Sequence, residues 1–62
     1  MVNHDDLMRE VVKVCEAFIN EAHACERRKT KASLKRLRKL TLEMRNLGKE
    51  YRAVSVSEEK SL

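Results

Sequence analysis

Hydrophobic positions recur along this chain at alternating steps of three and four residues, and they do so twice within only 62 residues. Steps that average about 3.5 residues keep these side chains on one face of a helix and are the period of left-handed helix packing. The sequence therefore predicts an all-α fold with two amphipathic helices. The two stripes consist of Met8, Val11, Cys15, Phe18, Ala22 and Cys25, flanked by Leu7 and Val14, and of Ser33, Leu37, Leu40, Met44, Leu47, Tyr51 and Val54, flanked by Leu34 and Leu42.

A short connection between the two helices gives a helical hairpin. We expect the first helix over about residues 4–27, after Asn3 as N-cap, and the second over about residues 31–54, after Thr30 as N-cap, with a turn at about 28–30. The chain has no proline, and its one glycine, Gly48, falls inside the second helix. Residues 1–54 thus form one small domain, and residues 55–62, which offer little to bury, are predicted to be a flexible tail.

A single hairpin leaves part of such wide stripes in water because each helix has only one neighbour. A chain of this size buries only about 60% of its unfolded surface and usually needs a disulfide, a metal or a partner chain. Two cysteines are too few for a disulfide framework. We therefore expect a homodimeric four-helix bundle. Its predicted core and dimer residues are Met8, Val11, Cys15, Phe18, Leu37, Leu40, Met44, Leu47 and Tyr51.

Charge is segregated along the chain. Eight of the thirteen residues 27–39 are basic and none is acidic. Residues 1–25 carry five acids and two bases, net −3, whereas residues 26–54 carry eleven bases and three acids, net +8. Such a run of like charges indicates an anionic partner, of which the nucleic-acid backbone is the commonest, and a solvated helix face is the alternative. Glu16 and Glu21, in the acidic half, are not expected to contribute.

The sequence gives little support for a disulfide, a metal site or a catalytic site. Cys15 and Cys25 lie on the hydrophobic stripe, about 15 Å apart along the helix axis, which is too far for a disulfide. The closely spaced ligand pairs of a zinc site are missing, and no nucleophile, base and orienting group occur together. We therefore predict no enzyme, no metal and no cofactor. No hydrophobic stretch resembles a signal peptide or a membrane span, which indicates a reducing, intracellular compartment.

The second helix also carries a residue pattern. Its elements are Lys31-Ala32, Arg36-x-Arg38-Lys39, Leu42-Glu43, Leu47, Lys49-Glu50-Tyr51-Arg52 and Val54-Ser55-Val56. This pattern resembles the linker-histone-like nucleoproteins first named from chlamydiae, which have short relatives in bacteria and large DNA viruses, over about residues 29–56. The resemblance implies a chromosomal protein that binds and compacts DNA, with contacts at the matching basic positions. Two departures are Lys29-Thr30, where the family commonly has Gly-Asn, and a Ser-Glu-Glu-Lys-Ser-Leu end in place of a long Lys- and Ala-rich tail.

We therefore predict a histone-like architectural protein that binds duplex DNA through its phosphates without reading sequence. Residues 27–39 contain no Asn, Gln or aromatic residue to read bases. The alternatives are a hairpin dimer that binds structured RNA and a module that binds an acidic protein. No membrane or small-molecule partner is expected, and the expected location is the cytoplasmic nucleoid, or viral chromatin or the virion for a viral chain. The predicted DNA-binding residues are Arg27, Arg28, Lys29, Lys31, Lys35, Arg36, Arg38, Lys39, Lys49 and Arg52.

Overall fold

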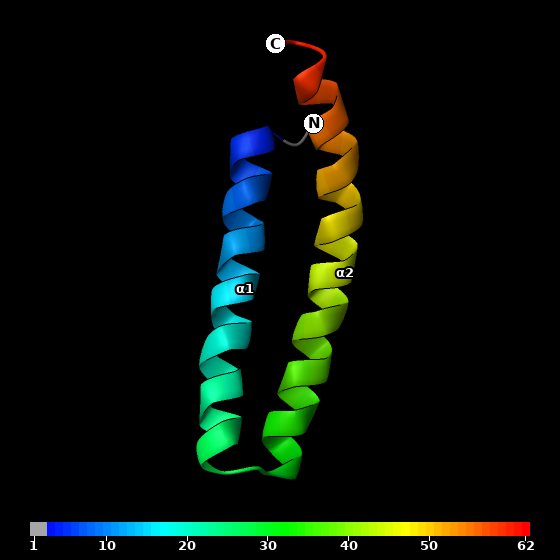
Figure 1. The fold of residues 1–62 in the computed structure, drawn as a ribbon. Coiled ribbons are helices and arrows are strands. Elements are labelled where there is room, and N and C mark those ends of the chain that lie inside the picture. The colour runs from blue at the N-terminus through cyan, green and yellow to red at the C-terminus, as the bar shows by residue number, and fades with distance from the viewer. Residues whose placement is uncertain (1–2) are drawn as a thin grey trace.

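Two long helices form an antiparallel hairpin (Figure 1). The computed structural model describes residues 3–62, in which α1 spans His4–Arg27 and α2 spans Lys31–Glu59. The molecule is a rod of 46 × 15 × 14 Å. At its closed end the chain turns through residues 28–30, and at its open end the beginning of α1 lies beside the later part of α2 (Figure 1). The predicted all-α class is confirmed, with no strand among the described residues.

Side-chain caps begin both helices. The Asn3 side chain accepts hydrogen bonds from the backbone N–H groups of Asp5, at 2.8 Å, and Asp6, at 3.4 Å. At α2, the Thr30 hydroxyl accepts from the Ser33 N–H at 3.1 Å, and the Ser33 hydroxyl oxygen accepts from the Thr30 N–H at 3.1 Å. This reciprocal capping box satisfies backbone donors that have no partner within the helix. The turn therefore has a defined geometry without glycine or proline.

The second helix continues to Glu59 instead of ending near residue 54, so most of the predicted flexible tail is helical. Val54 and Ser55 are half-buried, so the stripe that faces α1 extends past the predicted end. Residues 55–59 contain neither glycine nor proline. Serine and valine are each less favourable in a helix than alanine by less than about 1 kcal/mol. Nothing in this segment stops the helix, and its composition alone was a misleading signal.

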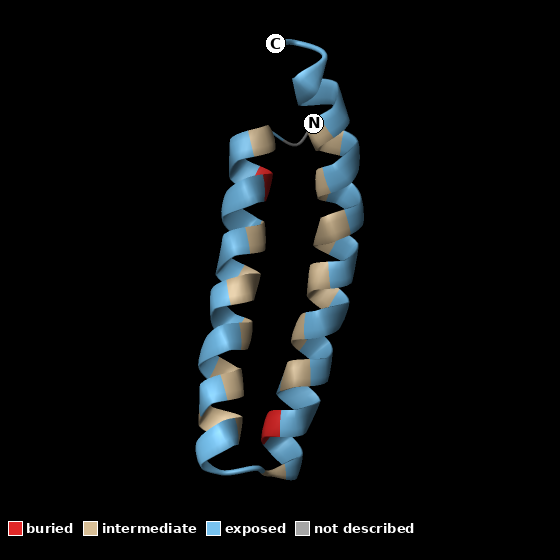
Figure 2. Cartoon of the chain, viewed as in Figure 1, coloured by how far each residue is buried: buried red, intermediate tan, exposed pale blue. Residues whose placement is uncertain are grey.

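The half-buried residues of the two helices face one another along the whole rod, and the opposite faces are exposed (Figure 2). The second stripe lies on this inner face of α2 as predicted, with Ser33 only 3% exposed. At the beginning of α1, the residues that face α2 are shifted by one position from the predicted stripe. Leu7, placed at the edge of the stripe, is 3% exposed, whereas Met8, predicted for the core, is 43% exposed in the hairpin.

An aromatic contact joins the helices at the open end. His4 Nδ1 is hydrogen-bonded to the Asp5 carboxylate at 3.0 Å, and His4 Nε2 to the Tyr51 hydroxyl at 3.1 Å. The two ring centroids are 5.3 Å apart. Both residues are half-buried, so this contact brings the first turn of α1 against α2 and covers the end of the stripe.

Gly48 is half-buried in α2, yet it is not required by the backbone or by a close contact. It has no positive φ, and a Cβ added there would meet only the Arg52 guanidinium, at 3.8 Å. We expect Gly48→Ala to raise the free energy of unfolding by about 1 kcal/mol, because alanine loses less backbone entropy in a helix. Thermal and urea unfolding followed by circular dichroism would measure this.

The reverse change at a nearby exposed position, Ala53→Gly, is the matched control and should lower stability by about the same amount. A loss of stability in Gly48→Ala would contradict the open environment of Gly48. It would indicate that a second chain packs closely against this point of α2.

Candidate nucleic-acid interface

The closed end of the rod carries most of the basic residues. We call residues 27–39 the basic cluster; it comprises the last residue of α1, the connection and the first two turns of α2. All eight basic side chains of the cluster are exposed. The hairpin brings no acid from the beginning of α1 to this end, because that segment lies at the opposite end of the rod (Figure 1).

The capping box fixes the position from which these cations extend. Ser33 is almost fully buried, and its hydroxyl also donates to the Thr30 carbonyl at 2.9 Å. Lys31 thus belongs to a first turn with no acidic residue, although helix N-termini usually favour acids. Positive charge accumulates at the positive end of a helix dipole, and an external anion would relieve this arrangement.

The ten predicted DNA-binding residues do not form a single patch. The eight of the basic cluster lie together at the closed end, whereas Lys49 and Arg52 are exposed farther along α2, nearer the open end. Arg45, which the sequence interpretation did not select, is exposed between these two groups. A count of bases in a short window favours the dense cluster and misses an isolated cation such as Arg45.

One member of the basic cluster has an intramolecular partner. Arg36 Nε donates to the Glu21 carboxylate at 2.6 Å, although the two residues are 15 positions apart in the sequence. The Glu21 side chain is only 20% exposed and that of Arg36 is 58% exposed. Glu21, although it belongs to the acidic half of the sequence, therefore contacts the basic cluster. Partly exposed pairs are worth only about 0–1 kcal/mol, so an anion can compete for Arg36 at small cost.

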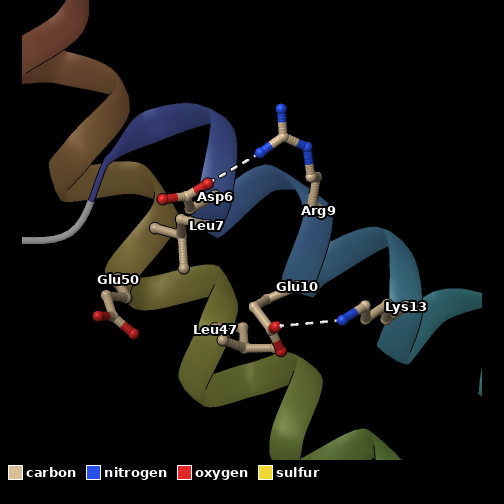
Figure 3. Close-up of a pocket in the computed structure, with 7 residues that line it drawn as sticks. All are labelled: Asp6, Leu7, Arg9, Glu10, Lys13, Leu47 and Glu50. Carbon is tan, nitrogen blue, oxygen red and sulfur yellow. Dashed lines mark hydrogen bonds and ion pairs between the residues drawn. The ribbon is translucent and has the colours of Figure 1, made fainter.

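A groove at the other end has a different character. It measures about 450 Å³ and runs between the helices beside Leu7 and Leu47 (Figure 3). Its charged residues are largely paired with one another, Arg9 with Asp6 at 2.8 Å and Lys13 with Glu10 at 3.7 Å. Glu50 adds a negative charge on the α2 side (Figure 3). This groove is not suited to a polyanion.

No group of three or more His, Cys, Asp or Glu side chains within residues 3–62 could hold a metal ion. Cys15 and Cys25 are free and half-buried. Over the same residues, neither helix has a stretch long and apolar enough to cross a bilayer. The exposed cations are thus the main chemical feature of this surface.

The structure is thus a small α-helical hairpin whose closed end carries exposed basic side chains. The sequence profile of the family described as Histone H1-like protein Hc1 matches residues 5–61. The chain belongs to this family, whose members are structural DNA-binding proteins of the nucleoid. The match covers both helices and so extends well beyond residues 29–56, which carry the pattern that resembles this family. No curated protein and no solved structure matches the chain.

The Glu21–Arg36 pair gives a test of the interface. In Glu21→Gln the Arg36 guanidinium loses its carboxylate, so we expect affinity for duplex DNA to rise about two- to fivefold, since about 1 kcal/mol corresponds to fivefold. The dependence of log affinity on log salt should steepen by up to about 0.9 per chain. Fluorescence anisotropy at several salt concentrations would measure both.

Glu16→Gln removes the same charge from an exposed position of α1 that has no ion pair among residues 3–62. It controls for the general effect of net charge. Equal gains in the two variants would show that Arg36 makes no phosphate contact of its own.

Proposed function

We propose that this protein is a sequence-nonspecific duplex DNA-binding protein that organises and condenses the chromosome. The observation that carries the proposal is the basic cluster, eight exposed cations around one fixed turn, in a chain of the histone H1-like family. Lysine and arginine bind phosphates without distinguishing sequences, and the affinity comes largely from counterion release. The nucleoid is the corresponding location, or viral chromatin for a viral chain.

The chemistry of the cluster favours phosphate contacts over base recognition. Bidentate arginine contacts can read guanine in the major groove, but adenine is usually read by Asn or Gln. The cluster contains neither, and it has no aromatic side chain on which an unpaired base could stack. These features favour duplex DNA over single strands. Structured RNA has the same phosphate charge and is the second candidate, which the experiment below distinguishes.

We further propose that the working form is a homodimer with a four-helix core. Leu7 is the only hydrophobic residue among residues 3–62 that is buried in the single hairpin. On α1, Met8, Val12 and Ile19 are 43%, 47% and 53% exposed. They fall at steps of four and seven residues, which places them on one side of the helix, next to half-buried Cys15. A second hairpin against this side would cover the stripe that α2 leaves in water.

The dimer predicts a mass of twice the 7.3 kDa chain at micromolar concentration by light scattering or sedimentation. Ile19→Asp should convert the protein to monomers or unfold it, because it puts a charge into the proposed shared core. Asn20→Asp adds the same charge at the next position, which is exposed and polar, and should leave the mass unchanged. A folded monomer of the parent chain at these concentrations would contradict the four-helix bundle.

Binding itself is tested by a salt titration with duplex DNA, single-stranded DNA and a folded RNA. If each chain of a dimer contacts three or four phosphates, log affinity for duplex DNA should fall with log salt at a slope of about −5 to −7. Affinity should then drop by about 10³- to 10⁴-fold between about 50 and 200 mM salt. Arg38→Gln with Lys39→Gln should flatten the slope and weaken binding to all duplex sequences equally.

Preference for the folded RNA over duplex DNA at every salt concentration would replace the DNA function with the RNA-binding alternative. Binding to neither nucleic acid would leave an acidic protein as the partner.

A further inference from the structure

Four cations repeat along α2 at intervals of seven residues: Lys31, Arg38, Arg45 and Arg52. Seven residues are close to two helical turns, so each step rotates the position by only about 20°. The four side chains therefore lie within about 60° of one another around the helix and are about 10.5 Å apart along it. We call them the α2 ridge.

The α2 ridge lies on the outer face of the hairpin. All four residues are exposed, whereas the inner face of α2, with Leu40 and Leu47, packs against α1. None of the four takes part in an ion pair within residues 3–62. Four exposed charges of one sign thus follow a single line along most of the rod.

The two acids between Lys31 and Arg52 do not interrupt this line, whereas Glu59, seven residues after Arg52, ends it with a negative charge. Glu43 is half-buried and therefore belongs to the side nearer α1, and Glu50 lines the groove beside Leu47 (Figure 3). Lys49 stands one helical turn after Arg45 and adds a fifth exposed cation near the ridge. From Lys31 to Arg52 the line of the ridge therefore carries positive charges and no negative one.

The outer face of α1 shows what an ordinary solvated face of this protein looks like. At the same seven-residue spacing it carries Arg9, Glu16 and His23, which differ in charge, and Arg9 is paired with Asp6. Mixed charges with local pairs are typical of a face that meets only water. The uniform sign on α2 is not a general property of this chain.

We propose that the α2 ridge is a linear contact surface for the phosphate backbone of duplex DNA, so that α2 lies along the duplex and does not touch it with the closed end alone. This inference rests on the proposed DNA-binding function and extends it to Arg45 and Arg52. The ridge is about 32 Å long at 1.5 Å per residue. It therefore covers about nine base pairs at 3.4 Å each, close to one turn of the double helix.

An anionic membrane is the other large polyanion that could meet a basic helix. Leu34, Leu42 and Val56 are partly exposed on α2, at 39%, 58% and 54%. An interfacial helix, however, inserts a continuous apolar face into lipid, and the apolar face of α2 is turned toward α1 and half-buried against it (Figure 2). Leu34 and Leu42 lie singly among the five cations and Val56 lies beyond them, which fits contacts with a sugar-phosphate backbone better than insertion.

The test removes the half of the ridge that lies outside the basic cluster. Arg45→Gln with Arg52→Gln keeps good helix formers, so circular dichroism should be unchanged. Binding to a labelled duplex of about 20 base pairs should weaken at least tenfold at about 50 mM salt, and the salt slope should fall by up to about 1.8 per chain. Arg45→Lys with Arg52→Lys keeps the charge and should bind within about threefold of the parent chain, because a phosphate contact needs only a cation.

Arg9→Gln with Lys13→Gln is the matched control, since it removes the same charge from exposed positions of α1. It should weaken binding less than threefold. If the parent chain binds duplex DNA and the ridge and control variants lose affinity equally, the ridge is not the contact surface. The proposed function would then remain intact.

A parent chain that does not bind duplex DNA would overturn both the ridge and the proposed function. Loss of binding to phosphatidylserine vesicles by the ridge variant, with unchanged DNA binding, would also overturn the ridge as a DNA surface.

Discussion

The single seam between α1 and α2 is the interaction on which the rest of this structure depends. Hydrophobic burial is the main favourable term in folding, and here it is confined to one line of contact along a rod about 15 Å thick. Leu7 and Ser33 are the only residues among those described that are buried, and they lie near opposite ends of the seam. Most stripe residues are half-covered, so the seam aligns the helices but leaves hydrophobic surface available for association.

The same seam separates two kinds of surface. The inner faces hold the hydrophobic residues, and the outer face of α2 and the closed end hold nearly all unpaired positive charge. Contact between the helices couples these surfaces at one place, where Glu21 of α1 pairs with Arg36 of α2. Packing and electrostatics are therefore mostly independent in this protein, and surface cations can be changed without disturbing the seam.

The sequence predicted features that depend on neighbouring residues, and it failed where distant residues decide. The caps at Asn3 and Thr30 and the position of the basic cluster beside the turn are local. The way in which the two helices meet decides which side of the wide α1 stripe faces α2. Leu7 is therefore buried and Met8 exposed, the reverse of the prediction. The Glu21–Arg36 pair needs the hairpin to bring residues 15 positions apart together. The second helix ends at Glu59, beyond the predicted end near residue 54, because the polar composition of residues 55–59 does not by itself stop a helix.

The position of the basic cluster at one tip of a 46 Å rod has a consequence for assembly. Two rods aligned in the same direction would place their basic tips side by side. The combined tips would then put more positive charge against a single duplex. Two rods aligned in opposite directions would carry a basic tip at each extremity and act as a strut between two duplexes. In the proposed dimer, the relative direction of the two chains would thus determine whether DNA is coated or cross-linked.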